Sequence, residues 1–328
     1  MDPRIEVGPM NKEKNITTDG ADSTGLRFHI ITQRELEKIL TIPKALIFLI
    51  IAIIVPFLTA DAADVKNYPL DIQALMLKDI LFFVTYFWVA GIVLAFFASW
   101  IVTDFVAGEV SRGTLLSLIT KPIHRWEVIL GKFIAYIIFI TILEVIAIFI
   151  TIYVLVTFSG AHISVIGELV QYIPILLLFA LFVALVFGTI PLALSTISKS
   201  RVLVMIIMAA LVIAMYLGFY IIRSGFPEVY VDYQLYHFDL GYHLGNIFVS
   251  FSDAANISLT PTFQEQMGLF AGTHDLGISL DEPDQSFQLA SIPMTNYYSQ
   301  LGSWLIWTLI PIGLTIMALL KLNRKEVQ

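Results

Sequence analysis

The sequence contains no cysteine and few charged residues. The absence of cysteine from all 328 residues excludes disulfides, a thiolate nucleophile and a cysteine-based zinc site. Charged residues make up 14% of the chain and hydrophobic residues 58%, whereas soluble domains average about a quarter charged and about half apolar. The mean hydropathy is +0.83. A water-soluble core cannot hide this much apolar surface, so we expect an all-α membrane protein surrounded by lipid.

Sequence motifs for enzyme chemistry are also missing. The only Gly-Lys pair is Gly131-Lys132, and Trp126 stands where a phosphate-binding loop of the GxxxxGK[ST] type has its first glycine. The chain has no GxSxG nucleophile elbow and no HExxH zinc motif, and its six histidines are scattered. We therefore expect no catalytic residues and no cofactor, metal ion or nucleic acid bound by this chain.

Six segments are long and apolar enough to cross a bilayer, for which a helix needs about 20 residues. They are followed and preceded by polar stretches, which divide the chain into expected regions. The expected spans are residues 44–60, 80–101, 128–157, 170–196, 202–221 and 300–320. The other expected regions are a disordered tail (1–26), an amphipathic helix (27–43), a polar loop within the first five spans (102–127 of 44–221), an external loop (222–299) and a final tail (321–328).

The basic residues are distributed unequally between the two sides of this topology. Sixteen of the 19 lysines and arginines lie before span one, between spans two and three, between spans four and five, or after span six. Only Lys66, Lys78 and Arg223 fall on the other side. The positive-inside rule then predicts that both termini are cytoplasmic, in a multi-pass protein of a cell membrane.

Residues 27–43 interleave apolar and charged side chains at a spacing that suits an amphipathic helix lying at the membrane interface. Pro43 disfavours a continuous helix into span one, so the chain can turn there. An ordinary juxtamembrane anchor would account for this segment equally well.

The polar stretch between spans two and three combines charge, glycine and a small apolar patch. Thr103 or Asp104 could cap a new helix beginning there. Glu109 and Arg112 are three residues apart, so they would share a helix face and could pair. Such a helix suits docking into a groove on a soluble subunit. A solvated surface loop with an incidental ion pair is the alternative.

The residues of this stretch also resemble a known family. Asp104, Gly108-Glu109, Gly113-Thr114, Leu116, Pro122, Arg125 and Gly131-Lys132 are similar to the first cytoplasmic loop of ABC-2 type transporter permeases. The resemblance implies a six-helix bundle of the ABC-2 permease type, with an interfacial elbow helix before span one and, in this chain, an enlarged external loop between spans five and six.

The same resemblance implies partners and a mechanism. The chain would be the permease of a prokaryotic exporter, paired with a second permease copy or a related permease chain, and a separate ABC ATPase subunit would carry ATP and Mg²⁺. The residues implied in coupling to that ATPase are Asp104, Gly108, Glu109, Arg112, Gly113, Thr114, Leu115, Leu116, Pro122 and Arg125.

Glu144 is the one carboxylate in the middle of an expected span. Intramembrane carboxylates are costly and usually face a bundle interior or a wet cavity. Glu144 is therefore a candidate for the translocation path. Alternatively, it is a protonated structural residue hydrogen-bonded to span four, where Thr189, Ser195 and Thr196 are possible partners and Thr189 is the best placed by depth.

Three other functions remain as alternatives to a permease. A non-transporting anchor could pass ATPase motion to an extracytoplasmic partner, which the long acidic external loop would suit. An intramembrane enzyme would need a nucleophile and base in the spans, and the sequence shows none. Ion-coupled transport is disfavoured because no inverted repeat is apparent and Glu144 stands alone.

Overall fold

The computed structural model describes residues 19–111, 125–198, 200–276 and 292–324. Within these ranges the chain is nearly all helical and has no β-strand; a single antiparallel bridge joins His274 to Met294. The described helices include six that are long and apolar enough to cross a membrane, as expected. These spans are Ile42–Ala62, Leu70–Gly108, Trp126–Phe158, Ile173–Ile197, Arg201–Gly225 and Gln300–Lys321.

The second span begins about three turns earlier than the sequence predicted. It consists of α3 (Leu70–Val84), the π-helix η1 (Thr85–Val93) and α4 (Leu94–Ser111) without a break. Hydropathy alone did not assign the first turns of α3 to the span, because they contain buried polar residues that lower the local hydropathy. These residues are held by partners distant in sequence: Lys78 Nζ donates to the Ser258 carbonyl at 3.1 Å, and Asp79 accepts a hydrogen bond from Thr260.

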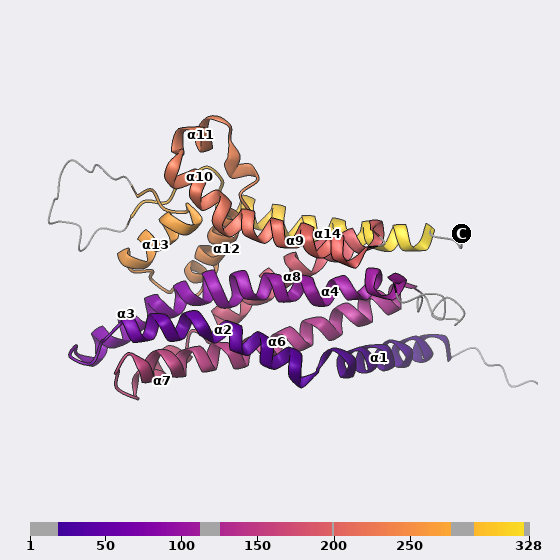
Figure 1. The fold of residues 1–328 in the computed structure, drawn as a ribbon, viewed down its shortest axis with the longest axis horizontal. Coiled ribbons are helices and arrows are strands. Elements are labelled where there is room, and N and C mark those ends of the chain that lie inside the picture. The colour runs from indigo at the N-terminus through magenta and orange to yellow at the C-terminus, as the bar shows by residue number, and fades with distance from the viewer. Residues whose placement is uncertain (1–18, 112–124, 199, 277–291, 325–328) are drawn as a thin grey trace, which may run out of the picture.

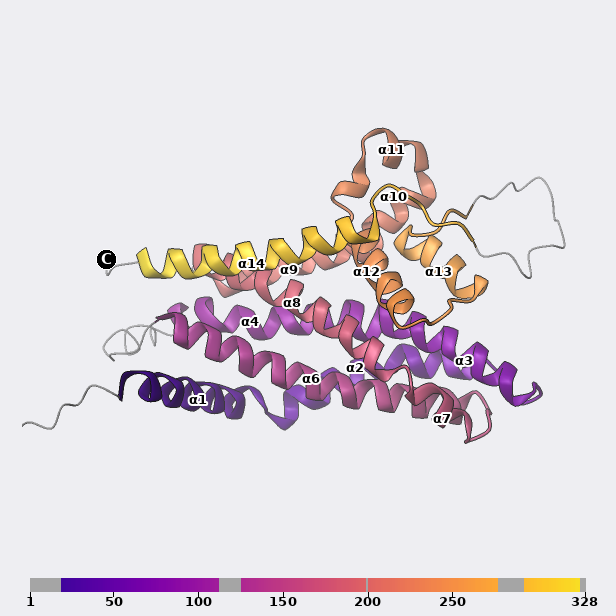
Figure 2. The same ribbon diagram turned by 180° about the vertical axis from the view of Figure 1, so that it is seen from behind.

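The long helices lie roughly side by side along the longest axis of the molecule (Figures 1 and 2). The second and fourth spans form the centre of the bundle. In each of them, 67% of the apolar membrane-spanning stretch is buried. In this centre α4 packs against α8 (Ile173–Ile197), and Tyr86 of η1 contacts Phe179 of α8 with the ring centroids 5.3 Å apart. The first, fifth and sixth spans are peripheral and expose apolar side chains, as lipid-facing helices do.

The two ends of the bundle differ. The start of α1 (Asp19–Ile39), the end of α4, the start of α6 (Arg125–Phe158) and the end of α14 (Gln300–Arg324) lie at one end, which we call the loop end (Figure 1). The opposite end carries α11 (Pro227–Asp232), α12 (Leu240–Ala254) and α13 (Pro261–Ala271), which we call the cap. The expected external loop is thus largely helical among its described residues.

A helix before span one is present as α1 (Asp19–Ile39), and α2 (Ile42–Ala62) follows after a break at residues 40–41. α1 begins eight residues earlier than expected, so residues 19–26 are helical and not part of a disordered tail. Pro43 lies in the first turn of α2, where its missing N–H is tolerated. α1 packs on α6: a Cβ on Gly131 would lie 2.8 Å from Ile31 Cγ2, so only glycine allows this approach. Figure 1 shows α1 beside the start of α6.

A buried ion pair fixes the cap to the end of span five. Arg223 pairs with Asp239, which has no exposed side-chain surface, and also donates to the Phe270 carbonyl. Asp239 also accepts from Tyr230 Oη at 3.0 Å and from the Tyr242 amide at 3.1 Å, which caps α12. Because the fully buried Asp239 is bonded to three different groups, the cap is positioned by hydrogen bonds as well as by apolar packing.

A second polar contact joins the cap to span six, which is formed by α14 (Gln300–Arg324). The Nδ1 atom of buried His243 lies 2.9 Å from Ser303 Oγ, and Asn246 Nδ2 donates to the same oxygen at 3.1 Å. Burial lowers the pKa of His243 to about 4, and burial likewise lowers the pKa of His274 to about 4. Both imidazoles are therefore neutral at physiological pH.

We predict that the cap weakens in acid. A histidine whose pKa is lower in the folded chain than its ordinary 6.5 contributes stability that is complete above pH 6.5 and is lost as the pH falls towards 4. The midpoint of thermal unfolding in detergent should fall across this range. His243→Asn keeps a hydrogen-bonding group beside Ser303 but cannot titrate, so its midpoint should fall less, with His274 supplying the remainder. Equal pH dependence in the two proteins would contradict this assignment.

Candidate functional site at the loop end

The polar segment singled out in the sequence begins in span two and ends in span three. Asp104, Gly108 and Glu109 lie in the last turns of α4, and Arg125 is the first residue of α6. The other residues implied in coupling fall outside the described residues: Arg112, Gly113, Thr114, Leu115, Leu116 and Pro122. Among the described residues, α4 continues past Asp104 to Ser111, so no new helix begins at Asp104. A force on this segment would therefore act on α4 and α6 themselves.

The expectation that Thr103 or Asp104 caps a new helix is wrong. α4 runs unbroken from Leu94 to Ser111, so both residues are inside a helix. The Thr103 hydroxyl donates to the Ser99 carbonyl one turn earlier, at 2.6 Å. Continuation of the α4 backbone hydrogen bonds leaves no free amide for a cap to satisfy at this position.

Asp104 instead forms an ion pair with another span. Its Oδ1 lies 3.0 Å from Nε of Arg201, the first residue of α9 (Arg201–Ile213). Ser200 precedes α9 and caps it, accepting a hydrogen bond from the Leu203 amide at 3.3 Å. About a third of each charged side chain is exposed, so the pair contributes little stability, about 0–1 kcal/mol. Its consequence is geometric: it links spans two and five next to the polar segment.

Lys132 links spans two and three at the same end. The lysine is 2% exposed, and its Nζ donates to the Phe105 carbonyl of α4 at 3.1 Å. The neighbouring Gly131 is the point at which α1 approaches α6. The loop end is thus a junction in which α1, α4, α6 and α9 are joined around the residues that the sequence singled out.

Two π-helical segments face each other in the middle of the bundle. η1 in span two packs against η2 (Ala214–Gly218) in span five, where the Phe87 and Tyr216 rings meet edge to face at 5.8 Å. A Cβ on Gly91 would lie 2.4 Å from the Tyr86 carbonyl oxygen and 3.0 Å from Tyr216 Oη. π-helical turns often occur at functional sites. Spans two and five are thus in contact twice, through the Asp104–Arg201 pair at the loop end and through η1 and η2 in the middle of the bundle.

A sequence model describing ABC-2 family transporter proteins matches residues 29–326, nearly the whole chain. The chain belongs to this family. No curated protein matches it. ABC-2 permeases are transmembrane components that are generally not enzymes and generally work with an ABC ATPase. The match confirms the expected ABC-2 permease family.

Glu144 of the ABC-2 permease is fully buried, and neither of its carboxylate oxygens has a hydrogen-bond partner among the described residues. The expected partners are elsewhere: Thr189, Ser195 and Thr196 each donate to a carbonyl of their own helix. The register explains this. Gly188 of α8 packs on Phe133 and Tyr136 of α6. Thr189, the next residue of α8, therefore lies level with Tyr136 or an earlier residue of α6. Glu144 is at least eight residues further along α6, which is about 12 Å at 1.5 Å per residue.

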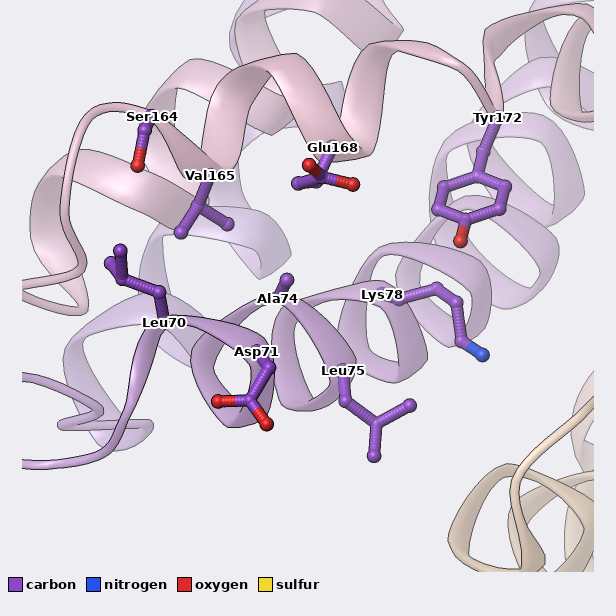
Figure 3. A pocket seen from close by; sticks show the side chains of 9 residues that line it. All are labelled: Leu70, Asp71, Ala74, Leu75, Lys78, Ser164, Val165, Glu168 and Tyr172. Carbon is purple, nitrogen blue, oxygen red and sulfur yellow. The ribbon is translucent and has the colours of Figure 1, made fainter.

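The permease has a polar pocket at the cap end that the sequence did not point to. It occupies about 470 Å³ between α3 and α7 (Val165–Val170), and its charged lining residues are Asp71, Lys78 and Glu168 (Figure 3). Tyr172 stands at one side, and burial with the nearby Glu168 raises the pKa of its phenol. Asp71 and Lys78 are seven residues apart on one face of α3, which is the signal that could have revealed the pocket.

We predict that Glu144→Gln leaves the permease folded and active. A fully buried carboxyl without a charged partner is compatible with the fold only in its neutral form, and glutamine keeps its shape and polarity. The thermal midpoint and the ATP-dependent transport of the variant should match those of the wild type. A folded variant without transport would instead place Glu144 on the translocation path.

We also predict that Gly91→Ala destabilises the protein, by about 1–3 kcal/mol as for other overpacked sites. The added methyl would collide with a backbone oxygen that cannot move without changing the π-helix. Gly313→Ala is the matched control, because a Cβ there meets nothing within 4 Å. Thermal unfolding of both variants in the same detergent measures the difference, and equal midpoints would contradict the prediction.

Proposed function

We propose that this chain is the permease subunit of an ABC exporter and that a separate ATPase subunit docks on the segment from Asp104 to Lys132. The observation that carries the proposal is that both ends of this segment belong to spans, since α4 continues past Asp104 to Ser111 and α6 begins at Arg125. A force on these two helix ends would act on spans two and three themselves.

The contacts at the loop end suggest how the movement is shared. In this proposal, closure of the nucleotide-bound ATPase pushes on the segment between α4 and α6. Lys132 carries the push between spans two and three through the Phe105 carbonyl, and the Asp104–Arg201 pair carries it to span five. The paired π-helices η1 and η2 are the place where spans two and five would bend, since their backbone hydrogen bonding already departs from the α-helical pattern.

The distribution of basic residues supports a cytoplasmic loop end in a prokaryotic cell membrane. Lysines and arginines of α1, the start of α2, the start of α6, the start of α9 and the end of α14 gather there, whereas the cap end holds Lys66, Lys78 and Arg223. An excess of basic residues marks the cytoplasmic side. The cap is then extracytoplasmic, and both termini are cytoplasmic.

A second permease copy or a related permease chain completes the proposed transporter, with substrate moving outward along the interface between the two. The peripheral helices α2, α9 and α14 present exposed apolar side chains that would contact lipid or this second chain. No ATP, Mg²⁺ or other cofactor is assigned to this chain, because both would be held by the ATPase subunit.

The cap supports one alternative. Its buried Arg223–Asp239 pair and its contacts with spans two, five and six make it a structured unit attached firmly to the bundle. A cap of this kind would also suit a membrane anchor that passes ATPase motion to an extracytoplasmic partner. ATP-dependent movement of a substrate in vesicles containing permease and ATPase would exclude the anchor, and its absence with ATP hydrolysis intact would favour it.

We predict that Glu109→Lys and Leu115→Asp each abolish co-purification of the ATPase and the stimulation of its activity by the permease, with the thermal midpoint of the permease unchanged. Charge reversal at the end of α4 and a carboxylate in the apolar patch of the polar segment would both oppose docking. Pull-down in mild detergent and ATPase assay in proteoliposomes measure the two effects.

Glu168→Lys provides the matched control for charge reversal, since Glu168 is exposed at the opposite end of the bundle. It should retain ATPase binding and stimulation. Normal ATPase binding by both loop-end variants, or an equal loss in the control, would overturn the proposed docking site.

A further inference from the structure

The pocket between α3 and α7 lies at the cap end, away from the polar segment. It occupies about 470 Å³, and its lining carries both signs of charge. The charged and hydroxyl-bearing residues of this lining are Asp71, Lys78, Ser164, Glu168 and Tyr172. A pocket binds a ligand through a few polar groups that match it, so a ligand for this one would carry a positive and a negative group of its own.

The two carboxylates of the pocket are open to a ligand. Asp71 and Glu168 are exposed, and among the described residues neither carboxylate has an ion pair or a hydrogen bond. Figure 3 shows Glu168 projecting from α7 into the space between α7 and α3. Carboxylates that line one pocket without a cation of their own favour a ligand with an ammonium group, because such a group can donate a charge-assisted hydrogen bond to each of them.

Lys78 and Tyr172 place hydrogen-bond donors at the other end of the pocket (Figure 3). Lys78 is 6% exposed, and its ammonium donates to the Ser258 carbonyl at 3.1 Å. That bond uses one of three ammonium protons, so two remain for a ligand. The Tyr172 ring packs edge to face on Phe82 of α3, with centroids 5.2 Å apart, which holds the phenol at this end. An ammonium beside a phenol suits an anion such as phosphate.

Donors and carboxylates follow the same order on both walls of the pocket. Lys78 lies seven residues beyond Asp71, about 10 Å further along α3 towards the middle of the bundle. On the other wall, Tyr172 immediately precedes span four, and Glu168 lies about one turn further out, in α7. The end that suits an anion is therefore deeper in the membrane, and the carboxylates lie nearer to the water.

A phospholipid with an ethanolamine headgroup carries its charges in this order. Its phosphate is attached next to the acyl chains, and its primary ammonium is at the outer end of the headgroup. The primary ammonium can donate hydrogen bonds to both carboxylates, whereas the quaternary ammonium of choline has no proton to donate. A glycerol headgroup has no cation to place beside the carboxylates, so they would repel its phosphate.

We infer that this pocket binds an ethanolamine phospholipid, with its phosphate at Lys78 and Tyr172 and its ammonium at Asp71 and Glu168. The bound headgroup would join α3 to α7, and thereby span two to the connection between spans three and four. The inference does not depend on the proposed ATPase, which docks at the opposite end of the bundle. Soluble ethanolamine phosphate is the other source of the same chemistry, and the position of the pocket beside the start of span four favours the lipid.

The test compares the full-length chain in nanodiscs of phosphatidylcholine with and without added phosphatidylethanolamine. The added lipid should raise the thermal midpoint of the wild type, because a ligand that binds only the folded state stabilises it. Glu168→Gln and Tyr172→Phe should each at least halve this rise, and phenylalanine keeps the ring that packs on Phe82. Glu228→Gln is the control and should show the full rise, since Glu228 is an exposed carboxylate of α11 outside the pocket lining.

Native mass spectrometry of the same proteins provides a second readout. Retained phosphatidylethanolamine is expected on the wild type and on Glu228→Gln, and it should be at least halved on the two pocket variants. An equal rise, or equal retention, in Glu168→Gln and the wild type would overturn the site.

Two further arms identify the ligand. A rise from phosphatidylglycerol as large as that from phosphatidylethanolamine would show that the ammonium group is not recognised, and would overturn the ethanolamine headgroup. Soluble ethanolamine phosphate is added to nanodiscs of phosphatidylcholine in the second arm. A rise as large as that from the lipid, lost in Glu168→Gln, would assign the pocket to a soluble ligand and overturn the lipid.

Discussion

The packing of the second span against the fourth is the contact on which the rest of the structure depends. These two helices are the most buried, and the Tyr86–Phe179 ring contact, together with Phe248 of the cap, fills the space between them and the cap. In lipid the hydrophobic effect gives helices little reason to associate with one another, so such packing and a few interhelical hydrogen bonds must hold them. The Tyr136 hydroxyl, which donates to the Ala184 carbonyl at 2.9 Å, is one of these bonds.

The polar contacts divide between the two ends of the bundle and differ in strength. At the cap end, the buried Asp239 pairs with Arg223 and accepts hydrogen bonds from Tyr230 and from the Tyr242 amide. These contacts fix the cap to the spans. At the loop end, the Asp104–Arg201 pair is a third exposed and weak. A transporter needs a region where spans can shift at low cost, and the partly exposed Asp104–Arg201 pair suits that need better than the buried network of the cap.

Glu144 and the π-helical segments lie between these ends. Proteins retain a buried carboxyl without partners, or a helix with irregular hydrogen bonding, only where the surrounding packing holds them. Here they occupy the middle of spans two, three and five, the same spans that the contacts at the loop end link together. The departures from regular, fully bonded structure are thus concentrated in the helices that the proposed mechanism moves.

The sequence by itself determined the membrane class, the six spans, the break before Pro43 and the gathering of basic residues at one end, because each follows from local composition summed over about 20 residues. It also held enough of the family pattern between Asp104 and Lys132 to identify an ABC-2 permease. Only the tertiary structure decided that α4 continues through Asp104, that Arg201 is the partner of Asp104, and that Thr189 is too far along the bundle to reach Glu144. Hydropathy measures how far a segment favours lipid, whereas helix register and hydrogen-bond partners depend on which residues of distant segments pack together. Gly131 and Gly188, whose missing side chains set the α1–α6 and α6–α8 contacts, show how a single position can fix that register.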